Sequence, residues 1–565
     1  MSLFGSINIA GNSLLVAQIG LQVTGQNIAN VNTPHYSREE LIVAPAVVQR
    51  FGSITLGLGV EAKGVVQKID RFLEQRLRAA TSDSASADIQ KQAYTQLEQV
   101  LGELQDSDLG SSLNNFFASI NEVLNQPESL TVRNLAVSQG KSLAADFSRL
   151  GQRVAGLRND QNNQVVAAAG DVNRLLKEIG TLNLQISQSE SSDFSTSDAV
   201  GLRDERSRAL ADLAGLIDVQ TAEQTDGSVN VFSGGDFLVF GGTVRQVELT
   251  YRSDRGLTVA DLRIAESQAN LNVGSGKVAG LLVSRDEILG GFQDKIDQLA
   301  GTLAYEFNKV FTSGQGQKGY KDVTSISAVD NAAAPLDAAG LPFTPTNGSF
   351  QVQIYDRSTN TTQTRDISVQ LNGLPNDTTL DNLVAQLNTV PGLSATISPT
   401  RQLRLRTTSS TQEVAFANDS SGTLAALGIG TFFTGSTAVG LGVNAAIVSD
   451  PAKFAASNSG IGSGTGQAVL LADFLNQPLA AIDGESLNTR YSRIVGETSQ
   501  AAAAVGGAAA GFKNFEQNLR GQHLAISGVN LDEEAIKLLN YQQIYQASAK
   551  FIATVSELLD VLINL

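Results

Sequence analysis

The chain has 565 residues, a length that suits two to four domains rather than a single core. Its formal net charge of −16 argues against a nucleic-acid partner, because phosphate binding needs clustered Lys and Arg side chains. The chain contains no Cys and two His, which excludes disulfides and Cys/His zinc sites. We therefore expect neither a cofactor nor a metal.

The N-terminal segment carries no charged side chain through residue 37. Its apolar residues predict a helix over about residues 5–31, which should end before Pro34 because the residue before a proline disfavours helical angles. Ile7, Leu14, Leu21 and Ile28 share one heptad position, and Ala10, Ala17, Thr24 and Val31 share a second. Asn and Gln residues interrupt the apolar run, so we expect no membrane insertion.

In the middle of the chain, segments with the periodicity of strands alternate with segments with the periodicity of helices. Short strands are predicted over residues 41–70 and helices over 84–190 and 198–216. Strands are predicted again over 217–283, and a helix over 284–312. Over residues 320–448 the composition shifts to Thr, Asn, Ser, Gly and Pro, which predicts a compact α+β domain inserted into a helical scaffold.

Helices resume after residue 466, and the last one is predicted to begin at Asn530. Asn530 and Glu533 form a capping-box pattern at the start of this helix. Glu533 and Lys537, which have opposite charges and lie one turn apart, are predicted to form an ion pair that stabilises the helix. Two heptad lines follow, formed by Leu538, Tyr545, Ile552 and Leu559 and by Tyr541, Ser548, Val555 and Leu562. Each end of the chain has a long apolar stripe, so we expect the first and last helices to pack together.

These elements predict a multidomain α+β fold. It has coiled-coil-like terminal helices, a helical-bundle trunk built from both chain ends and β-rich outer domains inserted in the middle. The expected divisions are a terminal core (1–40 and 525–565), a mainly helical trunk (41–216, 284–319 and 449–524), a β-rich subdomain (217–283) and an outer insertion (320–448).

No group of residues predicts catalysis. His35 follows a proline in a predicted turn and His523 lies on a polar helix face, and neither has a nucleophile or carboxylate partner that the sequence identifies. Paired acids such as Asp204–Glu205 are typical of solvated surfaces. We therefore expect that the protein is not an enzyme.

Two terminal motifs resemble a known family. Residues 27–38 read Asn-Ile-Ala-Asn-Val-Asn-Thr-Pro-His-Tyr-Ser-Arg, which is similar to the N-terminal signature of bacterial flagellar rod, hook and hook-associated proteins. Residues 527–534 and 539–550, with the ending Leu-Ile-Asn, resemble the hook-associated branch of this axial family. The two motifs cover roughly a fifth of the chain.

The resemblance implies a secreted structural subunit of the flagellum at the hook–filament junction. The partners it implies are copies of the chain in a junction ring, hook protein, the next hook-associated protein, an export chaperone on the C-terminal helix and the flagellar secretion apparatus. The predicted assembly interface includes Asn27, Asn30, Asn32 and Pro34 of the N-terminal motif. Its other members are heptad residues: Ile7, Leu14, Leu21, Ile28, Leu538, Tyr541, Tyr545, Ile552, Val555, Leu559 and Leu562. We also expect the two ends to be mobile in the free subunit and to order on assembly.

Two alternatives remain open at this point. The chain could be another axial subunit, a filament or hook protein, since these share the N-terminal signature. A different class would be a secreted binding module housed in residues 320–448, although that segment has no His and no cluster of aromatic residues for stacking on a sugar.

Overall fold

A computed structural model describes residues 3–51, 54–102, 108–190 and 197–563, without the side chains of 3–4, 49–51, 54–56 and 562–563. The chain divides into two compact units. Unit 1 comprises residues 1–92, 159–285 and 503–565, and unit 2 comprises residues 93–158 and 286–502. The multidomain α+β class predicted from the sequence is confirmed.

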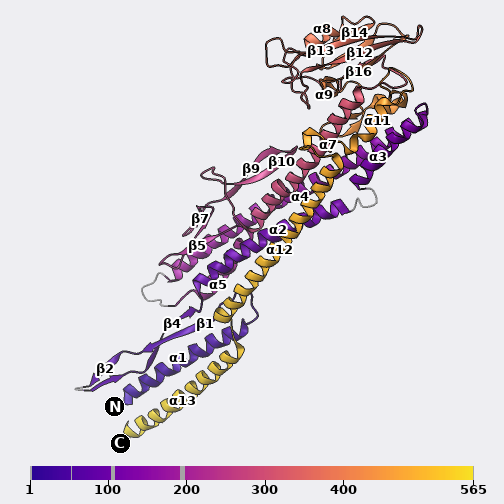
Figure 1. The fold of residues 1–565 in the computed structure, drawn as a ribbon. Helices are drawn as coiled ribbons and strands as arrows, with labels where there is room; N and C mark the ends of the chain where they lie inside the picture. The colour runs from indigo at the N-terminus through magenta and orange to yellow at the C-terminus, as the bar shows by residue number, and fades with distance from the viewer. Residues whose placement is uncertain (1–2, 52–53, 103–107, 191–196, 564–565) are drawn as a thin grey trace. The chain divides into compact units, whose positions relative to one another are not determined.

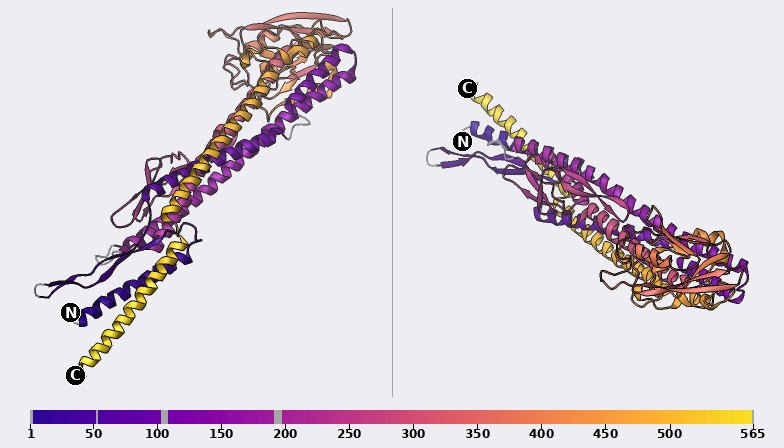
Figure 2. Two further views of the ribbon diagram at one scale, coloured as in Figure 1. Left: turned by 60° about the horizontal axis from the view of Figure 1, so that its bottom comes forward. Right: turned by 90° about the horizontal axis from the view of Figure 1, so that it is seen from above.

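The terminal part of unit 1 is a pair of helices beside small antiparallel ribbons. Helix α1 (Leu3–Ala29) packs along α13 (Leu531–Ile563), and the two lie side by side in each view (Figures 1 and 2). Strand β1 (Glu39–Pro45) pairs with β4 (Val60–Gln67), and β2 (Val48–Phe51) pairs with β3 (Ile54–Gly57). The expected packing between the two chain ends is confirmed.

The rest of unit 1 has its main hydrophobic core between helices and two antiparallel sheets. The helical residues of this core come from α4 (Leu130–Glu190), α5 (Val200–Leu216) and α6 (Gly276–Val283), and Ile89 of α2 (Arg71–Gly102) packs against it. Leu519 of α12 (Leu487–Ser527) packs with Leu73 and Ala80 of α2 in a small separate cluster. One sheet has the order β5–β6–β7–β8 (Gln220–Glu223, Val229–Ser233, Asp236–Phe240, Thr243–Val244), and the other pairs β9 (Val247–Asp254) with β10 (Leu257–Ile264). Buried Val172, Leu176 and Ile179 of α4 meet Leu210 and Leu213 of α5 in this core.

Unit 2 has a second core built around phenylalanine side chains. It involves α3 (Leu109–Asn125), the first part of α4, α7 (Gly290–Thr312) and α11 (Gly466–Asp473). The ring of Phe307 lies within 6.0 Å, centroid to centroid, of the rings of Phe116, Phe311, Phe432 and Phe474, at the distances typical of favourable aromatic pairs.

A third core lies within the β-rich part of unit 2. Two three-stranded antiparallel sheets have the orders β13–β12–β16 and β11–β15–β14, and α8 (Leu380–Leu387) packs its buried leucines into the same core. The strands are β11 (Asp322–Thr324), β12 (Gly348–Asp356), β13 (Thr361–Val369), β14 (Leu393–Ile397), β15 (Leu403–Thr407) and β16 (Gln412–Ala417). Short elements follow: α9 (Thr423–Leu427), β17 (Phe433–Thr434), β18 (Gly442–Val443) and α10 (Ala445–Ser449).

The predicted elements are largely present, with corrections at their boundaries. The first helix ends at Ala29, close to its predicted end before Pro34. Helix α2 begins at Arg71 rather than near residue 84, and residues 276–283 form α6 instead of continuing the predicted strands. The apolar run Val278–Val283 fits either element by periodicity, and burial of Val278 and Leu281 in the core of unit 1 favours the helix.

Candidate assembly interface

Helices α1 and α13 pack antiparallel with a matched seven-residue register. The side-chain amide of Asn27 on α1 donates to Glu534 Oε2 on α13 at 3.1 Å. Gly20, seven residues before Asn27 on α1, lies against Tyr541, which is seven residues after Glu534 on α13. One heptad back on α1 therefore corresponds to one heptad forward on α13, which is the relation expected of antiparallel helices. The chain thus joins segments more than 500 residues apart.

Small side chains of α1 allow this close approach. A Cβ atom at Gly20 would lie 2.5 Å from Tyr541 Cε1, so no side chain larger than hydrogen fits there without movement of the ring. Fully buried residues continue the same face of α1: Ala10, Val16, Ala17, Val23, Thr24 and Asn27. The large residues Ile7, Leu14, Leu21 and Ile28 lie half-buried.

On α13 the line that faces α1 repeats every seven residues. Glu534, Ser548 and Val555 are buried and Tyr541 is half-buried between them. Leu538, Ile552 and Leu559 of the second predicted line are half-buried, whereas Tyr545 is exposed. The side chain of Leu562 lies outside the described residues.

A buried amide closes the junction between the two ends. Asn27 is completely buried, and its Nδ2 donates to the Glu39 carbonyl at 3.0 Å as well as to Glu534. Its Oδ1 accepts from the Glu39 backbone N–H and from the Tyr36 hydroxyl, both at 2.9 Å. All the strong hydrogen-bonding capacity of this amide is used, which only Asn provides at this length.

A buried ion pair lies next to Asn27. Arg38 donates through Nε to Glu534 Oε1 at 2.8 Å, and its Nη1 contacts Glu533 Oε2 at 2.8 Å. Although burial disfavours its charge, hydrogen bonds to Glu534 and Glu533 raise the pKa of Arg38. Removing one partner of such a pair leaves the other as an uncompensated buried charge.

The predicted capping box is therefore only half right. Asn530 Oδ1 accepts from the Asp532 backbone N–H at 3.0 Å, as a cap should, but the Glu533 carboxylate contacts Arg38. Lys537 contacts Glu534 at 3.6 Å, one turn away, in place of the predicted Glu533. The acidic first turn of α13 binds the other end of the chain as well as capping its own helix.

The segment after α1 also contacts α5 and α12. The Ser37 backbone N–H and the Gln67 side-chain amide both donate to Asp204 Oδ1, at 3.2 and 2.6 Å, and the Arg38 N–H donates to the Ser527 carbonyl at 2.8 Å. Burial raises the pKa of Asp204 to about 7, and the nearby Glu39 carboxylate acts in the same direction. A titratable carboxyl thus sits at the joint between the helix pair and α5.

Three residues of the predicted interface make no side-chain hydrogen bond to α13 or to the buried network among the described residues. Asn30 bonds locally to the Gln26 carbonyl and to Thr33, and Asn32 and Pro34 are exposed. His35 is exposed in a turn with a φ of 61°, as its position after a proline suggested.

Sequence reasoning missed Arg38, Glu39 and Glu534 as interface residues. One signal was available, because Arg38 is the first charged side chain after a long uncharged helix.

Helix α13 also exposes large apolar side chains that α1 does not cover. Eight of them are at least 39% exposed: Leu531, Ile536, Leu539, Ile544, Tyr545, Phe551, Leu558 and Val561. So many exposed apolar side chains on one helix are typical of a protein interaction site. No described helix is long and apolar enough to cross a membrane, and no group of three or more potential metal ligands occurs among the described residues.

Comparisons with known proteins give a consistent result. Residues 94–323 match a family model described as the flagellar hook-associated protein FlgK helical domain, and residues 520–565 match the flagellar basal body rod FlgEFG protein C-terminal model. Flagellar hook-associated protein 1 of Escherichia coli (strain K12) is 26% identical over 580 residues, covering 99% of both chains. The chain is thus similar over its full length to flagellar hook-associated protein 1.

Two further proteins of this name are also similar to the chain. The protein of this name from Salmonella typhimurium is 26% identical over 99% of both chains, and that from Bacillus subtilis (strain 168) is 26% identical over 59% of this chain and 65% of its own. The fold is similar to the flagellar hook junction protein FlgK from Burkholderia pseudomallei, with a TM-score of 0.51, 18% identity and coverage of 80% of this chain and all of that one. Hook-associated protein 1 is a structural flagellar protein.

Proposed function

We propose that this chain is a structural subunit of the bacterial flagellum that joins the hook to the filament, without catalysis. The observation that supports this function is the antiparallel α1–α13 pair, which is closed by the buried Asn27–Arg38–Glu534 network and leaves large apolar side chains of α13 exposed. Such a pair can be covered by neighbouring subunits, which is what an axial assembly requires.

The proposed partners follow from this role. Copies of the chain form a ring, with hook protein on one side and the next hook-associated protein on the other. Before assembly, an export chaperone covers the exposed apolar side chains of α13, and the flagellar secretion apparatus exports the subunit to the cell exterior. Nucleic acid and membrane lipid have no part in this role.

The proposed layout assigns a position to each part of the chain. Residues 1–40 and 525–565 form the axial core of the assembly, and the helical trunk surrounds it. The insertion at 320–448 faces outward, since its polar, Thr-rich strand β13 is exposed over most of its length. An outward domain is free to differ between species without disturbing the axial contacts.

Binding to isolated hooks tests the proposed function. Purified full-length protein is added to hook–basal bodies and located by immunogold electron microscopy, with variants that lack residues 1–35 or 532–565. We expect the full chain at the distal hook end and neither truncated chain bound, while circular dichroism shows that the remaining helices stay folded. Undiminished binding of either truncated chain would overturn the proposal, and growth of long filaments from the pure protein would indicate a filament subunit instead.

The order of the ends gives a second test. Four glycines in α1 each cost about 0.8–1 kcal/mol relative to Ala, so we propose that α1 orders fully only when neighbouring subunits cover the pair. Amide hydrogen exchange over residues 5–29 should be fast in the free chain and slow in the hook-bound chain. Equal protection in both states would contradict this coupling.

A further inference from the structure

Unit 1 contains a cavity of about 290 Å³ lined by four arginines. Arg71 and Arg78 come from α2, and Arg203 and Arg206 come from α5. Glu74 and Glu223 are the carboxylates on its wall. The volume corresponds to roughly ten water molecules, which is enough for one acidic side chain with its hydration.

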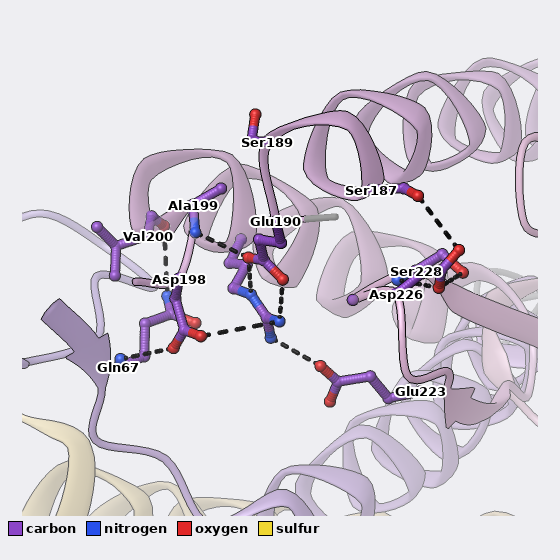
Figure 3. Close-up of polar contacts among 12 residues, drawn as sticks. Gln67, Ser187, Ser189, Glu190, Asp198, Ala199, Val200, Glu223, Asp226 and Ser228 are labelled. Atoms are coloured by element: carbon purple, nitrogen blue, oxygen red, sulfur yellow. Dashed lines mark hydrogen bonds and ion pairs between the residues drawn. The ribbon is translucent and has the colours of Figure 1, made fainter. Parts of the chain in front are cut away.

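Arg203 and Arg71 have close carboxylate partners on one wall of the cavity. Arg203 donates through Nε and Nη2 to Glu190 and through Nη1 to Glu223, each at 2.7 Å (Figure 3). Arg71 contacts the other oxygen of Glu223 at 2.8 Å. These two guanidinium groups and their carboxylates balance one another and organise one wall of the cavity.

Arg206 lacks such a partner. Its side chain is 4% exposed, and its Nη1 donates only to neutral oxygens, those of the Asn183 side chain at 3.0 Å and the Gly227 backbone at 2.6 Å. Among the described residues no carboxylate lies within ion-pair distance of it. A buried guanidinium without a counter-ion is costly, and burial together with nearby Arg203 lowers the pKa of Arg206 to about 10.

Arg78 has a donor to spare on the same cavity. Its Nη2 donates to Thr221 at 3.0 Å and its Nη1 has a long contact of 3.5 Å to Glu74. Its buried Nε has no hydrogen-bond partner among the described residues. The cavity is therefore lined by one arginine with an unpaired buried N–H and by one whose positive charge has no carboxylate partner among the described residues.

The rim of the cavity indicates what kind of occupant enters. Phe72 is 70% exposed at the edge of this arginine-lined site, and exposed aromatic residues beside arginines are typical of protein–protein interfaces rather than of sites for free ions. The chain itself supplies carboxylates, with 56 Asp and Glu residues and a net charge of −16. We propose that the cavity binds the carboxylate of an Asp or Glu side chain from a second copy of this chain, an inference that rests on the proposed assembly role.

Carbodiimide coupling can detect the docked carboxylate directly. The Arg78→Lys variant places a primary amine in the cavity, so coupling forms an amide with any carboxylate held there. An equal mixture of ¹⁴N- and ¹⁵N-labelled variant is bound to isolated hooks, coupled and digested, and the joined peptides are identified by mass spectrometry. We expect an amide between position 78 of one copy and an acidic residue of the other, seen as peptide pairs of mixed label.

The other outcomes would overturn the inference. These are coupling within one copy only, for example to Glu74, coupling to a different protein, or no coupling. If inorganic phosphate blocks coupling at position 78 and no mixed-label product forms, the cavity binds a free anion instead of a side chain. If hooks bind the chain but no mixed-label product forms, this inference fails and the proposed function stands; if hooks do not bind the chain, the proposed function fails first.

A matched pair of variants gives a second readout. Arg78→Met should weaken hook binding roughly tenfold, the size expected for losing one hydrogen bond to a charged group. Arg208→Met removes the same charge from an exposed position on α5 that does not line the cavity, and it should leave binding unchanged. Equal binding by both variants, with unchanged melting curves, would contradict the proposed contact.

Discussion

The buried carboxylate of Glu534 offers the sharpest test of how the two chain ends are held together. In Glu534→Ala, Arg38 remains 6% exposed and keeps only its contact to Glu533, and Asn27 loses one of its acceptors. Removing one partner of a buried ion pair typically costs about 3–5 kcal/mol. Because Glu533 still compensates part of the charge, we expect about 3 kcal/mol.

The neighbouring Glu533 provides a matched control. Its side chain is 57% exposed, so Glu533→Ala should cost no more than about 1 kcal/mol although it removes the same charge from the same helical turn. The effect therefore separates a buried network from the general electrostatics of the helix start.

Hydrogen exchange of the hook-bound chain measures the difference. Amides of α1 should exchange roughly 100-fold faster in Glu534→Ala than in the unmodified chain, and less than about fivefold faster in Glu533→Ala, since each 1.4 kcal/mol is a factor of ten. Equal rates in the two variants would refute the view that the buried Asn27–Arg38–Glu534 network fixes the pairing of the ends.

Three further predictions address packing and pH. Gly20→Ala should destabilise the helix pair by about 1–2 kcal/mol because its Cβ meets the Tyr541 ring. Gly25→Ala has no atom within 4 Å of the added Cβ and should stabilise the pair by about 0.5–1 kcal/mol. Hydrogen exchange of α1 measures both effects, and a gain in stability of the Gly20→Ala variant would contradict the close approach. The pKa of Asp204, about 7 in the fold against about 3.9 unfolded, means that the folded chain binds the proton more tightly, so stability should fall as pH rises from about 4 through 7. Asp204→Asn keeps an acceptor oxygen and should raise the free energy of unfolding by about 1–2 kcal/mol at pH 8, after discounting for partial exposure, and not at all near pH 4. Urea unfolding at several pH values measures this difference. If stability depends on pH equally in the variant and the unmodified chain, the effect is excluded. Phe307→Ala should cost about 3–5 kcal/mol in urea unfolding of unit 2, because the ring is fully buried among other aromatic rings, and a loss below 1 kcal/mol would show that the site collapses.

Local chemistry determined much of the fold from the sequence alone. Pro34 forbids continuation of the first helix, and Asn530 with the acidic residues after it marks the start of the last one, because both effects act over a few bonds. Heptad periodicity likewise predicted that the two ends pair, since a stripe of apolar residues needs a covering surface.

Where the spacing of apolar residues fits both a helix and a strand, the sequence alone did not determine the secondary structure. The run Val278–Val283 is too short to distinguish a buried strand from a buried helix, and only its contacts in the core of unit 1 decided for a helix.

The tertiary structure alone decided how the ends meet. The sequence suggested that Ile7, Leu14, Leu21 and Ile28 form the interface, but the closest approach uses Gly20, where the absence of a side chain makes room for Tyr541. The first helix has two lines of residues at heptad spacing, and the distance between the two helix axes determines which line is buried. That distance depends on the volumes of the side chains that both helices contribute to the contact.

The buried polar network was equally outside the reach of local rules. In the sequence, Asn27 and Arg38 belong to one N-terminal motif, whereas Glu534 lies about 500 residues later with no predicted role in the interface. They form one network only when the two ends are adjacent. Hydrogen bonds and ion pairs depend on distances of about 3 Å, and a sequence fixes such distances only within a few residues. The sequence therefore determined that the ends pair, and the folded chain decided the residues through which they do so.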